Sequence, residues 1–541
     1  MNVSAEQQGL GSPTDSNEEH DDKEPKEPLD ETNSNEDEGA GLSASEGTGL
    51  SASEEKREAL LSAYVEDPGI HTTLFGIEPI LAKRILHLGV PVIIGMLTQT
   101  FINIIDSVMV GRLPDEKAVA GMAAIGPSLK LLWMFGGFLS AIAVGTQAVT
   151  ARRYGEGDSK GAGRALTNSL ILALVSGILV TLTAVLSCEP IFQFLIPGES
   201  SRPAREAGIL YSEARFYGIF AMAMMASYKS FYDGVGQVRV HMTVAIIMNI
   251  LNVVLNYGLI FGNLGMPRLE VEGAAWASVA ASTAGLIIMA AWSLRGEDRK
   301  AFRVYRLSNF NPKVMWTIGK LSLGGGIATV VAMGGFLMFD KIVAMVDEEN
   351  DLPNVNLAAN ATIITISMIC FMATIAFGTA TATLVSQSLG AKKSTLARRY
   401  GWQSVKLVCI FTFLIGLTVI IDPEFILGLF LHIEEGTDSF NKQWAIDIAL
   451  LPLFLAGFGA PLAGTAMVLV QALYGAGESI FVMYVELVLH VIVFVPLAWL
   501  LGVYLEGDLV GCWFALGIYG IGLVGAMGWK FYGGSWEQNE L

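Results

Sequence analysis

Charged side chains inside long apolar stretches are the residues of this sequence that could do chemistry. Asp106 lies within FINIIDSVMV, and Lys130 lies midway along the next apolar run. A charge is costly to place in hydrocarbon, so each such residue marks a functional site by default. Asp106 could bind a cation or a proton in a wet cavity, or it could pair with a neighbouring helix and only stabilise the fold. Lys130 could neutralise a carboxylate or bind an anionic substrate, and the sequence leaves both readings open.

Three asparagines in a later apolar run form a second polar feature. Asn249, Asn252 and Asn256 are spaced i, i+3, i+7, which places them on one face of a helix. An amide oxygen can ligate a hard cation, although an amide cannot carry a proton as a carboxylate does. The same stripe could instead join packed helices through hydrogen bonds.

The second half of the sequence has four more ionisable residues in apolar runs, namely Asp340, Lys341, Glu486 and His490. Glu486 and His490 are four residues apart and therefore face the same way on a helix. Histidine changes its charge near neutral pH, so the two could form a proton-linked pair. They could equally form a satisfied structural pair.

Several classes of chemistry are not supported. The four cysteines are scattered without CxxC or Cys/His spacing, so we expect no metal site and no disulfide framework. The sequence contains no phosphate-binding loop, H-E-x-x-H or G-x-S-x-G motif. We therefore expect no enzyme and no catalytic residue, no cofactor, and no nucleic-acid partner.

Membrane-spanning helices are the elements that must position these residues. Hydrophobic residues make up 52% of the 541 residues and charged residues 16%, whereas soluble domains carry about a quarter charged residues. Apolar runs of this length can cross about 30 Å of hydrocarbon as helices. We predict an all-α membrane protein with twelve transmembrane helices near residues 88–110, 119–148, 165–187, 208–232, 239–262, 272–293, 315–346, 356–388, 398–421, 446–474, 480–502 and 508–532.

Basic residues predict how these helices are oriented. The loops on the N-terminal side carry 18 Lys and Arg residues, and the opposite loops carry six. Lys and Arg accumulate in cytoplasmic loops. We therefore expect a multi-pass protein of the cell inner (plasma) membrane with both termini in the cytoplasm.

The N-terminal segment differs in composition from the rest of the chain. Its first 67 residues hold 19 Asp and Glu against four Lys and Arg, and thus most of the net charge of −17. Such a segment has too little apolar surface to offset its chain entropy. We predict that residues 1–75 form a disordered acidic cytoplasmic tail.

The remaining chain consists of two halves that resemble each other. Asp106 and Asp340 are 234 residues apart, and Gly155 and Gly390 are 235 residues apart. A nearly constant offset indicates a duplicated domain. With six helices each, both halves begin on the same side of the membrane, so their symmetry axis should lie along the membrane normal with a substrate cavity between them. We predict an N-terminal lobe over residues 76–300 and a C-terminal lobe over residues 301–541.

Several segments resemble the multidrug and toxic compound extrusion (MATE) family. PVIIGMLTQTFINIIDSVMVGRL and VAGMAAIGPS are similar to its first two helices, and NILNVVLNYGLIFGNLGMPRLEVEGAAWASV is similar to its fifth and sixth. AVTARRYGEGD and LVSQSLGAKKS are similar to the links after its second and eighth helices. The resemblance covers residues 80–535 in the expected order. It implies a two-lobed, cation-coupled exporter of organic cations and amphipathic drugs that works by alternating access.

The resemblance also implies which residues bind the coupling ion. In the subgroup with its ion site in the N-terminal lobe, Asp106 matches an Asp, Asn252 matches an Asn, and Ser278 matches a hydroxyl position. Tyr217 roughly matches a tyrosine of the fourth helix. Asn256 departs from the pattern, because the family usually has an Asp there. The other subgroup uses carboxylates of its seventh and tenth helices, and the tenth helix predicted here has none.

Three functions compete at this point. The leading one is a monomeric antiporter in the lipid bilayer that exports a small organic solute, drug-like or metabolite, in exchange for Na⁺ or H⁺. The second is a lipid-linked oligosaccharide flippase of the same superfamily, for which a strongly basic cavity would be expected. The third is a membrane receptor or scaffold that transports nothing.

Overall fold

The computed structural model describes residues 59, 61–70, 73, 76–113, 128–195, 202–349, 355–430, 439–539 and 541. Within these ranges every regular element is a helix, which confirms the predicted all-α class. Helices suit this sequence because a lipid-exposed backbone must satisfy its N–H and C=O groups within its own segment. Residues 1–58, in the predicted tail, and 119–127, the predicted start of the second span, lie outside the described residues.

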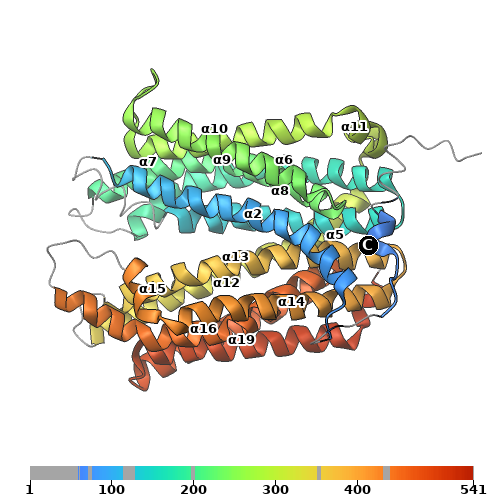
Figure 1. The fold of residues 1–541 in the computed structure, drawn as a ribbon. Coiled ribbons are helices and arrows are strands. Elements are labelled where there is room, and N and C mark those ends of the chain that lie inside the picture. Colours follow the sequence, from blue (N-terminus) through green and yellow to red (C-terminus); the bar gives the residue numbers. More distant parts are fainter. Residues whose placement is uncertain are drawn as a thin grey trace, which may run out of the picture. The chain divides into compact units, whose positions relative to one another are not determined.

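The first six spans form the N-terminal lobe. Its fourth span is divided at Gly218 into two helices of 16 residues each. In chain order the lobe contains α2 (Pro79–Val110), a broken helix over Ser128–Gly155 that ends in α5 (Ile142–Gly155), α6 (Ser159–Leu195), α7 (Arg202–Tyr217) with α8 (Ile219–Gly234), α9 (Val238–Phe261) and α10 (Glu270–Ser293). Figure 1 shows these helices grouped in one bundle, coloured blue to green.

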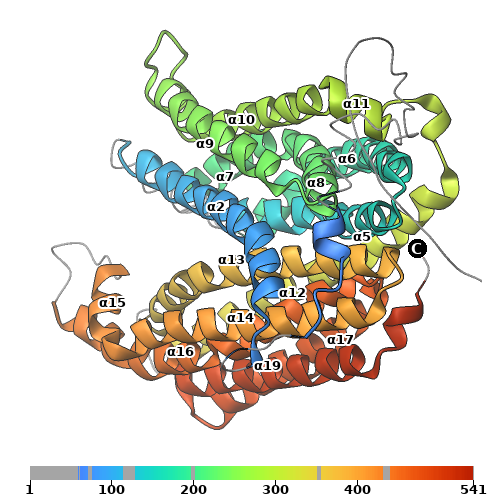
Figure 2. The ribbon, with the colours of Figure 1, turned by 45° about the vertical axis from the view of Figure 1, so that its right-hand side comes forward.

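The other six spans form the C-terminal lobe, which follows the short helix α11 (Gly296–Phe302). It contains α12 (Pro312–Glu349), α13 (Val355–Gly390), α14 (Ser394–Ile421) with the short α15 (Pro423–Phe430), α16 (Ser439–Gly475), a helix over Ser479–Tyr504 that begins with α17 (Ser479–Val488), and α19 (Asp508–Gly533). Figure 2 shows the same separation into two bundles after a rotation of the view. Apart from the divided fourth span, 11 helices of the described chain are long and apolar enough to cross a membrane.

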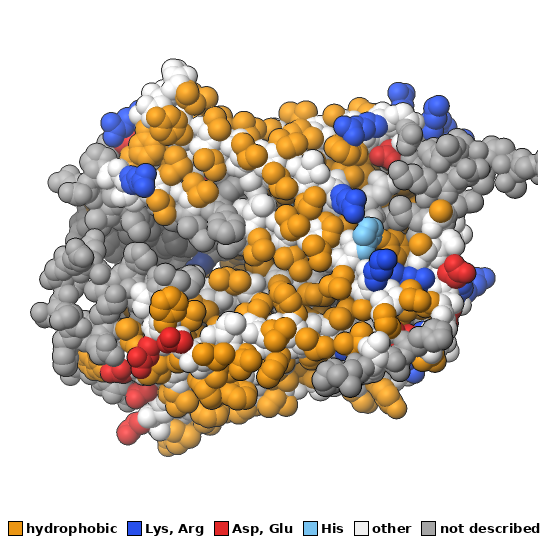
Figure 3. Space-filling view, viewed as in Figure 1, with side chains coloured by type: hydrophobic (Ala, Val, Ile, Leu, Met, Phe, Trp, Pro, Cys, Tyr) orange, Lys and Arg blue, Asp and Glu red, His pale blue; other side chains and the backbone are white. Residues whose placement is uncertain are grey.

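The outer surface of the helices is apolar. Figure 3 shows hydrophobic side chains across the middle of one face, with charged side chains mainly toward its two ends. On α6, for example, Val175, Leu179 and Leu186 are each more than 60% exposed. Soluble monomers rarely expose apolar surface over such an extent, so this surface is the part that contacts lipid.

The two lobes are joined through α5 and α13. The Gln147 side chain of α5 donates hydrogen bonds to the Thr379 carbonyl and to the Thr383 hydroxyl, both at 2.9 Å. The Ser386 hydroxyl donates to the Ala148 carbonyl at 2.8 Å. We call the end of the molecule at which α5 and α13 terminate the closed end.

Two glycines allow the backbones of α5 and α13 to touch at the closed end. A Cβ atom on Gly155 would lie 2.1 Å from the Gln387 carbonyl oxygen, and a Cβ on Gly390 would lie 2.2 Å from that of Arg152. Gly155 with Gly390 and Arg152 with Gln387 are both pairs of residues 235 positions apart. A contact in which each half presents the same residues to the other results from a two-fold axis. This geometry confirms the predicted repeat.

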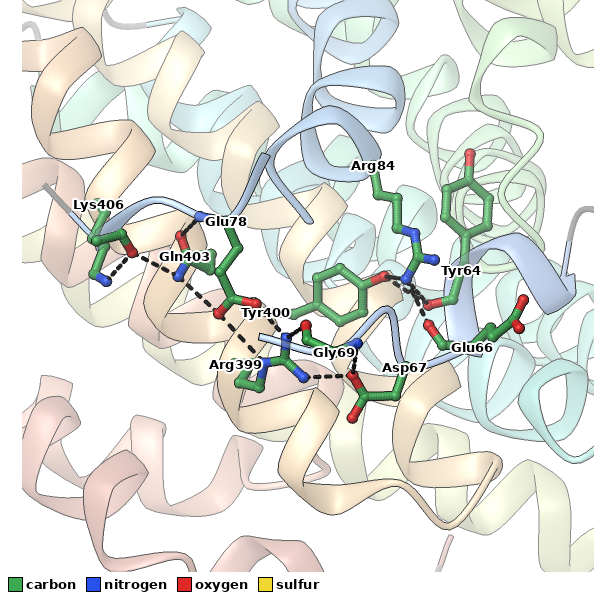
Figure 4. A network of polar contacts seen from close by, with 11 residues as sticks. Tyr64, Glu66, Asp67, Gly69, Glu78, Arg84, Arg399, Tyr400, Gln403 and Lys406 are labelled. Atoms are coloured by element: carbon green, nitrogen blue, oxygen red, sulfur yellow. Dashed lines mark hydrogen bonds and ion pairs between the residues drawn. The ribbon is translucent and has the colours of Figure 1, made fainter. Parts of the chain in front are cut away.

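The end of the predicted tail is attached to the helices. Tyr64 is 5% exposed and belongs to a hydrophobic core cluster that α2 shares with helices of the C-terminal lobe. Its carbonyl accepts a hydrogen bond from the Tyr400 hydroxyl at 2.6 Å, and Arg84 of α2 donates to that same hydroxyl at 2.9 Å. Figure 4 shows this network between the N-terminal segment, α2 and α14. The predicted boundary at residue 75 therefore lies too far along the chain, because a buried tyrosine supplies apolar surface that the acidic residues lack.

An ion pair holds the same segment at a second point. Arg399 of α14 lies 2.6 Å from Asp67 and also contacts Glu78. The hydrogen bond from Arg399 holds the pKa of Asp67 below its usual range. A carboxyl with a lowered pKa contributes stability above its unfolded-state pKa and loses it as the pH falls through the folded-state value. The attachment is thus intact at neutral pH and weakens only in acid.

Two N-terminal truncations should separate the tail from this attached segment. Removal of residues 1–58 leaves Tyr64 and Asp67 in place, so we expect an unchanged melting midpoint. Removal of residues 1–70 deletes both contacts and should lower the midpoint by a few degrees, with membrane insertion intact. Size-exclusion chromatography after heating measures the melting midpoint of each truncated protein. Equal midpoints for the two truncations would show that the attachment contributes no stability.

Candidate functional site

Asp106 lies at the centre of a polar cluster in the N-terminal lobe. The carboxylate is 8% exposed in the last part of α2, which packs against α9. Asn256 donates to Asp106 Oδ1, and the Ser278 hydroxyl of α10 lies 3.4 Å from Oδ2. The Asn252 amide is assigned the orientation in which its nitrogen donates a hydrogen bond to Asp106 Oδ1 at 3.1 Å, because both of its polar atoms then have hydrogen-bond partners. The structure thus brings together four residues that the sequence singles out.

The cluster has one acceptor without a donor. Oδ1 of Asn256 is buried and accepts no hydrogen bond from the described residues. Buried polar atoms are nearly always paired, and leaving one unpaired costs about 1–3 kcal/mol. The amide turns its nitrogen to the Asp106 carboxylate and leaves this oxygen unpaired, and carboxylate and amide oxygens are both ligands that hard cations prefer.

Asn249 and Tyr217 do not join the cluster. Asn249 is buried, but neither atom of its amide has a hydrogen-bond partner in the described part of the chain. Tyr217 is 53% exposed and stacks on Trp276 at a ring distance of 6.0 Å. The tyrosine of this helix that faces inward is Tyr211, which is 3% exposed. Six residues in a helix correspond to a rotation of about 240°, so Tyr211 and Tyr217 lie on different sides of α7.

Arg215 is a charged residue near Asp106 that the sequence reasoning missed. Its guanidinium lies 6.0 Å from the centre of the Tyr211 ring, and its Nε is buried without a partner among the described residues. Its charge acts on the Asp106 carboxylate, although the two form no direct ion pair. Arg215 lies inside the fourth span, so the rule that an intramembrane charge marks a site could have found it.

Replacing Arg215 by glutamine should increase the affinity of the Asp106 cluster for cations. The substitution removes a positive charge that repels an incoming cation, and a gain of about tenfold corresponds to about 1.4 kcal/mol of Coulomb energy. The Na⁺ and H⁺ dependence of transport measures the change. Arg202→Gln on the same helix is the control, because that side chain is exposed and pairs with Glu206. If R215Q and the wild type reach half-maximal transport at the same Na⁺ and H⁺ concentrations, the charge of Arg215 does not act on cation binding.

Lys130 pairs with a carboxylate of the opposite lobe. Its Nζ lies 3.2 Å from Asp340 Oδ2, and Asn360 donates to Asp340 Oδ1 at 3.2 Å. The side chains of Lys130 and Asp340 are 53% and 28% exposed, so the lobes are not sealed against each other here. The sequence left open whether Lys130 neutralises a carboxylate or binds an anionic substrate, and the ion pair with Asp340 favours the first. The neighbouring Lys341 is exposed.

Glu486 and His490 form a buried pair in the C-terminal lobe. Nδ1 of His490 lies 3.0 Å from Glu486 Oε2, and the Tyr519 hydroxyl donates to the same oxygen at 2.9 Å. The side chains of His490 and Glu486 are 1% and 8% exposed. No group of three or more His, Cys, Asp or Glu side chains that could hold a metal ion occurs among the described residues.

The two similar halves of this chain each match the model of a known protein family. The model of the MatE family matches residues 91–258 and again residues 321–500. This chain belongs to the MatE family. The two matched ranges fall in the two lobes, in agreement with the repeat seen in the closed-end contact. MatE membership makes the protein a membrane transporter rather than an enzyme.

Relatives and solved structures agree with MatE membership. The chain is 25% identical over 478 residues to a probable multidrug resistance protein NorM from Thermotoga maritima, with 86% of this chain and 95% of the relative covered. A transporter of the MOP superfamily from Pyrococcus furiosus, described as having a binding pocket of reverse polarity, superposes with a TM-score of 0.76 at 18% identity. That match covers 89% of this chain and 99% of the other. An outward-facing conformation of a multidrug resistance MATE transporter gives 0.73 at 20% identity, with 87% and 100% covered.

Proposed function

We propose that this MatE protein exports small organic solutes by alternating access, driven by the entry of Na⁺ or H⁺. The observation that carries the proposal is the buried Asp106 carboxylate beside the unpartnered Asn256 oxygen. The names of the relatives, multidrug resistance proteins, support drug-like solutes as cargo. The protein would act in the inner membrane as a monomer, with residues 76–300 and 301–541 as its two moving lobes.

The closed end would face the cytoplasm. The stretches that follow α5 and α13 carry several of the basic residues, among them Arg164, Lys392 and Lys393, and such residues accumulate on the cytoplasmic side. The hydrogen bonds between α5 and α13 then close the cytoplasmic route, while the half-exposed Lys130 lies on the outward-open side. The described conformation would be the one that releases solute and takes up the coupling ion.

Asp106 couples the ion to the conformation through its charge. A bare carboxylate is expensive to enclose away from water, whereas a carboxylate with a bound Na⁺ or proton is close to neutral. Cation binding therefore favours the state in which the cluster is sealed from solvent, and an ion can shift an equilibrium only by such a difference in affinity between states. Asn252, Asn256 and Ser278 would supply the oxygen ligands for Na⁺.

Dye export tests this function. Cells or vesicles with the full-length protein are loaded with ethidium, and efflux is followed while the Na⁺ and pH gradients are collapsed separately. We expect efflux to stop when the coupling gradient is removed and to persist when the other one is removed. Efflux that persists without either gradient would refute ion coupling, and the absence of any protein-dependent efflux would refute export of this class of solute.

The flippase alternative is weaker in this structure. A lipid-linked oligosaccharide carries diphosphate, so its cavity needs basic residues free to bind anions. Lys130, at the boundary between the lobes, is already paired with Asp340. A lysine already paired with a carboxylate fits a neutral or cationic solute better than a diphosphate.

A further inference from the structure

The pair of Glu486 and His490 is built as a proton-binding position. The Tyr519 hydroxyl donates to Glu486 Oε2 at 2.9 Å, and His490 Nδ1 lies 3.0 Å from that oxygen and 3.1 Å from the Glu486 backbone carbonyl oxygen. A backbone carbonyl can only accept a hydrogen bond, so Nδ1 carries the hydrogen of a neutral imidazole. The other ring nitrogen, Nε2, is buried and has no hydrogen-bond partner among the described residues. A satisfied structural pair would leave no such nitrogen.

The packing around His490 holds the ring in place. The ring lies among Phe336, Phe494 and Tyr519, with centroid distances of 6.3, 5.9 and 4.5 Å. The α-helix changes to a π-helix over Leu489–Phe494, which includes His490, and π-bulges often occur at functional sites. A Cβ on Gly335 of α12 would lie 2.5 Å from His490 Cδ2. Only glycine therefore leaves room for the imidazole.

The charged and titratable groups near the pair are few. Tyr474 of α16 and Tyr519 of α19 are the phenols within electrostatic reach of Glu486. On α12 the nearest charged residues are Asp340 and the exposed Lys341, which follow Gly335 by five and six positions. Five residues correspond to about 7 Å along a helix. The partly exposed Asp340 therefore lies about one and a half turns along α12 from the glycine that contacts His490.

We propose that Glu486, His490 and Tyr519 form a proton site of the C-terminal lobe, separate from the Asp106 cluster, that takes up one proton in each transport cycle. The idea rests on the proposed function of the protein as an ion-driven exporter. The proton adds to the lone pair of His490 Nε2 and converts the neutral imidazole to imidazolium. The charge of the pair changes from −1 to zero, and release of the same proton on the cytoplasmic side restores it. A neutral pair is less costly to enclose than a net charge.

Proton titration of the purified full-length protein tests the site without any assumption about transport. Potentiometric titration between pH 5 and 9 compares the wild type with His490→Gln, and the folded state of both is checked by size-exclusion chromatography. We expect the wild type to bind about one more proton per chain than H490Q over this range. Equal proton binding in the two proteins would overturn the proposal, because His490 would then be permanently neutral or permanently charged.

Transport by a pair of glycine variants tests whether the proton is coupled. Gly335→Ala should displace the His490 ring and reduce pH-driven ethidium transport in proteoliposomes at least tenfold, while ethidium exchange without a gradient stays within about twofold. Gly334→Ala is the matched control, because a Cβ there meets no atom within 4 Å. Normal pH-driven transport by G335A would overturn the coupling role. A wild type without gradient-driven transport would refute the proposed exporter function, and the titration would still decide whether the proton site exists.

Discussion

Replacement of Asp106 by asparagine should abolish gradient-driven export while substrate binding stays within about twofold of the wild type. Asparagine has nearly the same shape as aspartate but is permanently neutral, so ion binding no longer changes the cost of enclosing the site. We expect a loss of at least about 30-fold in driven ethidium efflux, which corresponds to a coupling free energy of about 2 kcal/mol. Efflux rate and ethidium binding are measured at equal expression.

A second buried carboxylate provides the control for this variant. Asp347 is 1% exposed and accepts hydrogen bonds from the backbone N–H groups of Asn356 and Leu357, both at 2.9 Å. It caps the start of α13, so Asp347→Asn should lower stability and leave export per folded molecule almost unchanged. Wild-type export by D106N under both gradients would place the coupling ion elsewhere, with Glu486 and His490 as the remaining candidates.

A side chain at Gly155 should disrupt the closed end. The added methyl group of Gly155→Ala would overlap the Gln387 carbonyl of α13, and that backbone must move. Overpacking of this kind costs about 1–3 kcal/mol, so the closed state should lose about 5- to 150-fold in population relative to states with the lobes apart. Export requires both states, and we expect it to fall at least tenfold. Gly390→Ala, which overlaps the Arg152 carbonyl, should have the same effect.

Accessibility labelling shows whether this loss comes from opening. Ser388 is buried near the contact, and a cysteine in its place should react with a membrane-impermeant maleimide faster in G155A than in an otherwise wild-type chain. Gly533→Ala is the control, because a Cβ there meets nothing within 4 Å. Unchanged labelling together with normal export would mean that the lobes do not separate at this contact.

Most of the fold could be predicted from the sequence, because a helix that crosses the lipid bilayer needs a long run of apolar residues. Long apolar runs mark the spans, and their approximate positions agree with the helices. The predicted span 208–232 is a pair of helices, α7 and α8, because the helix is interrupted at Gly218. The attachment of Tyr64 could not be foreseen, because one aromatic residue decides it within an acidic segment.

The candidate site was harder to predict than the fold. Asp106 and the spacing of Asn252 and Asn256 are visible in the sequence, because helical periodicity places the two amides on one face. Each residue turns a helix by about 100°, so the side of α7 that faces Asp106 depends on the exact register. The match of Tyr217 to a tyrosine of the family's fourth helix is too approximate to fix that register. The proximity of Arg215 to Asp106 depends on tertiary packing and has no signature in spacing.

The contact between α5 and α13 also bears on the origin of the chain. Gly155 meets the backbone at Gln387 as Gly390 meets the backbone at Arg152, so one surface patch binds its own copy. This is the property of an isologous homodimer interface. We infer that a six-helix ancestor paired with a parallel second copy through this patch before the two genes were joined. Once the copies shared one chain, Asp106 and Asp340, which the sequence offset pairs, were free to diverge, one toward a buried cluster of amides and the other toward an ion pair between the lobes.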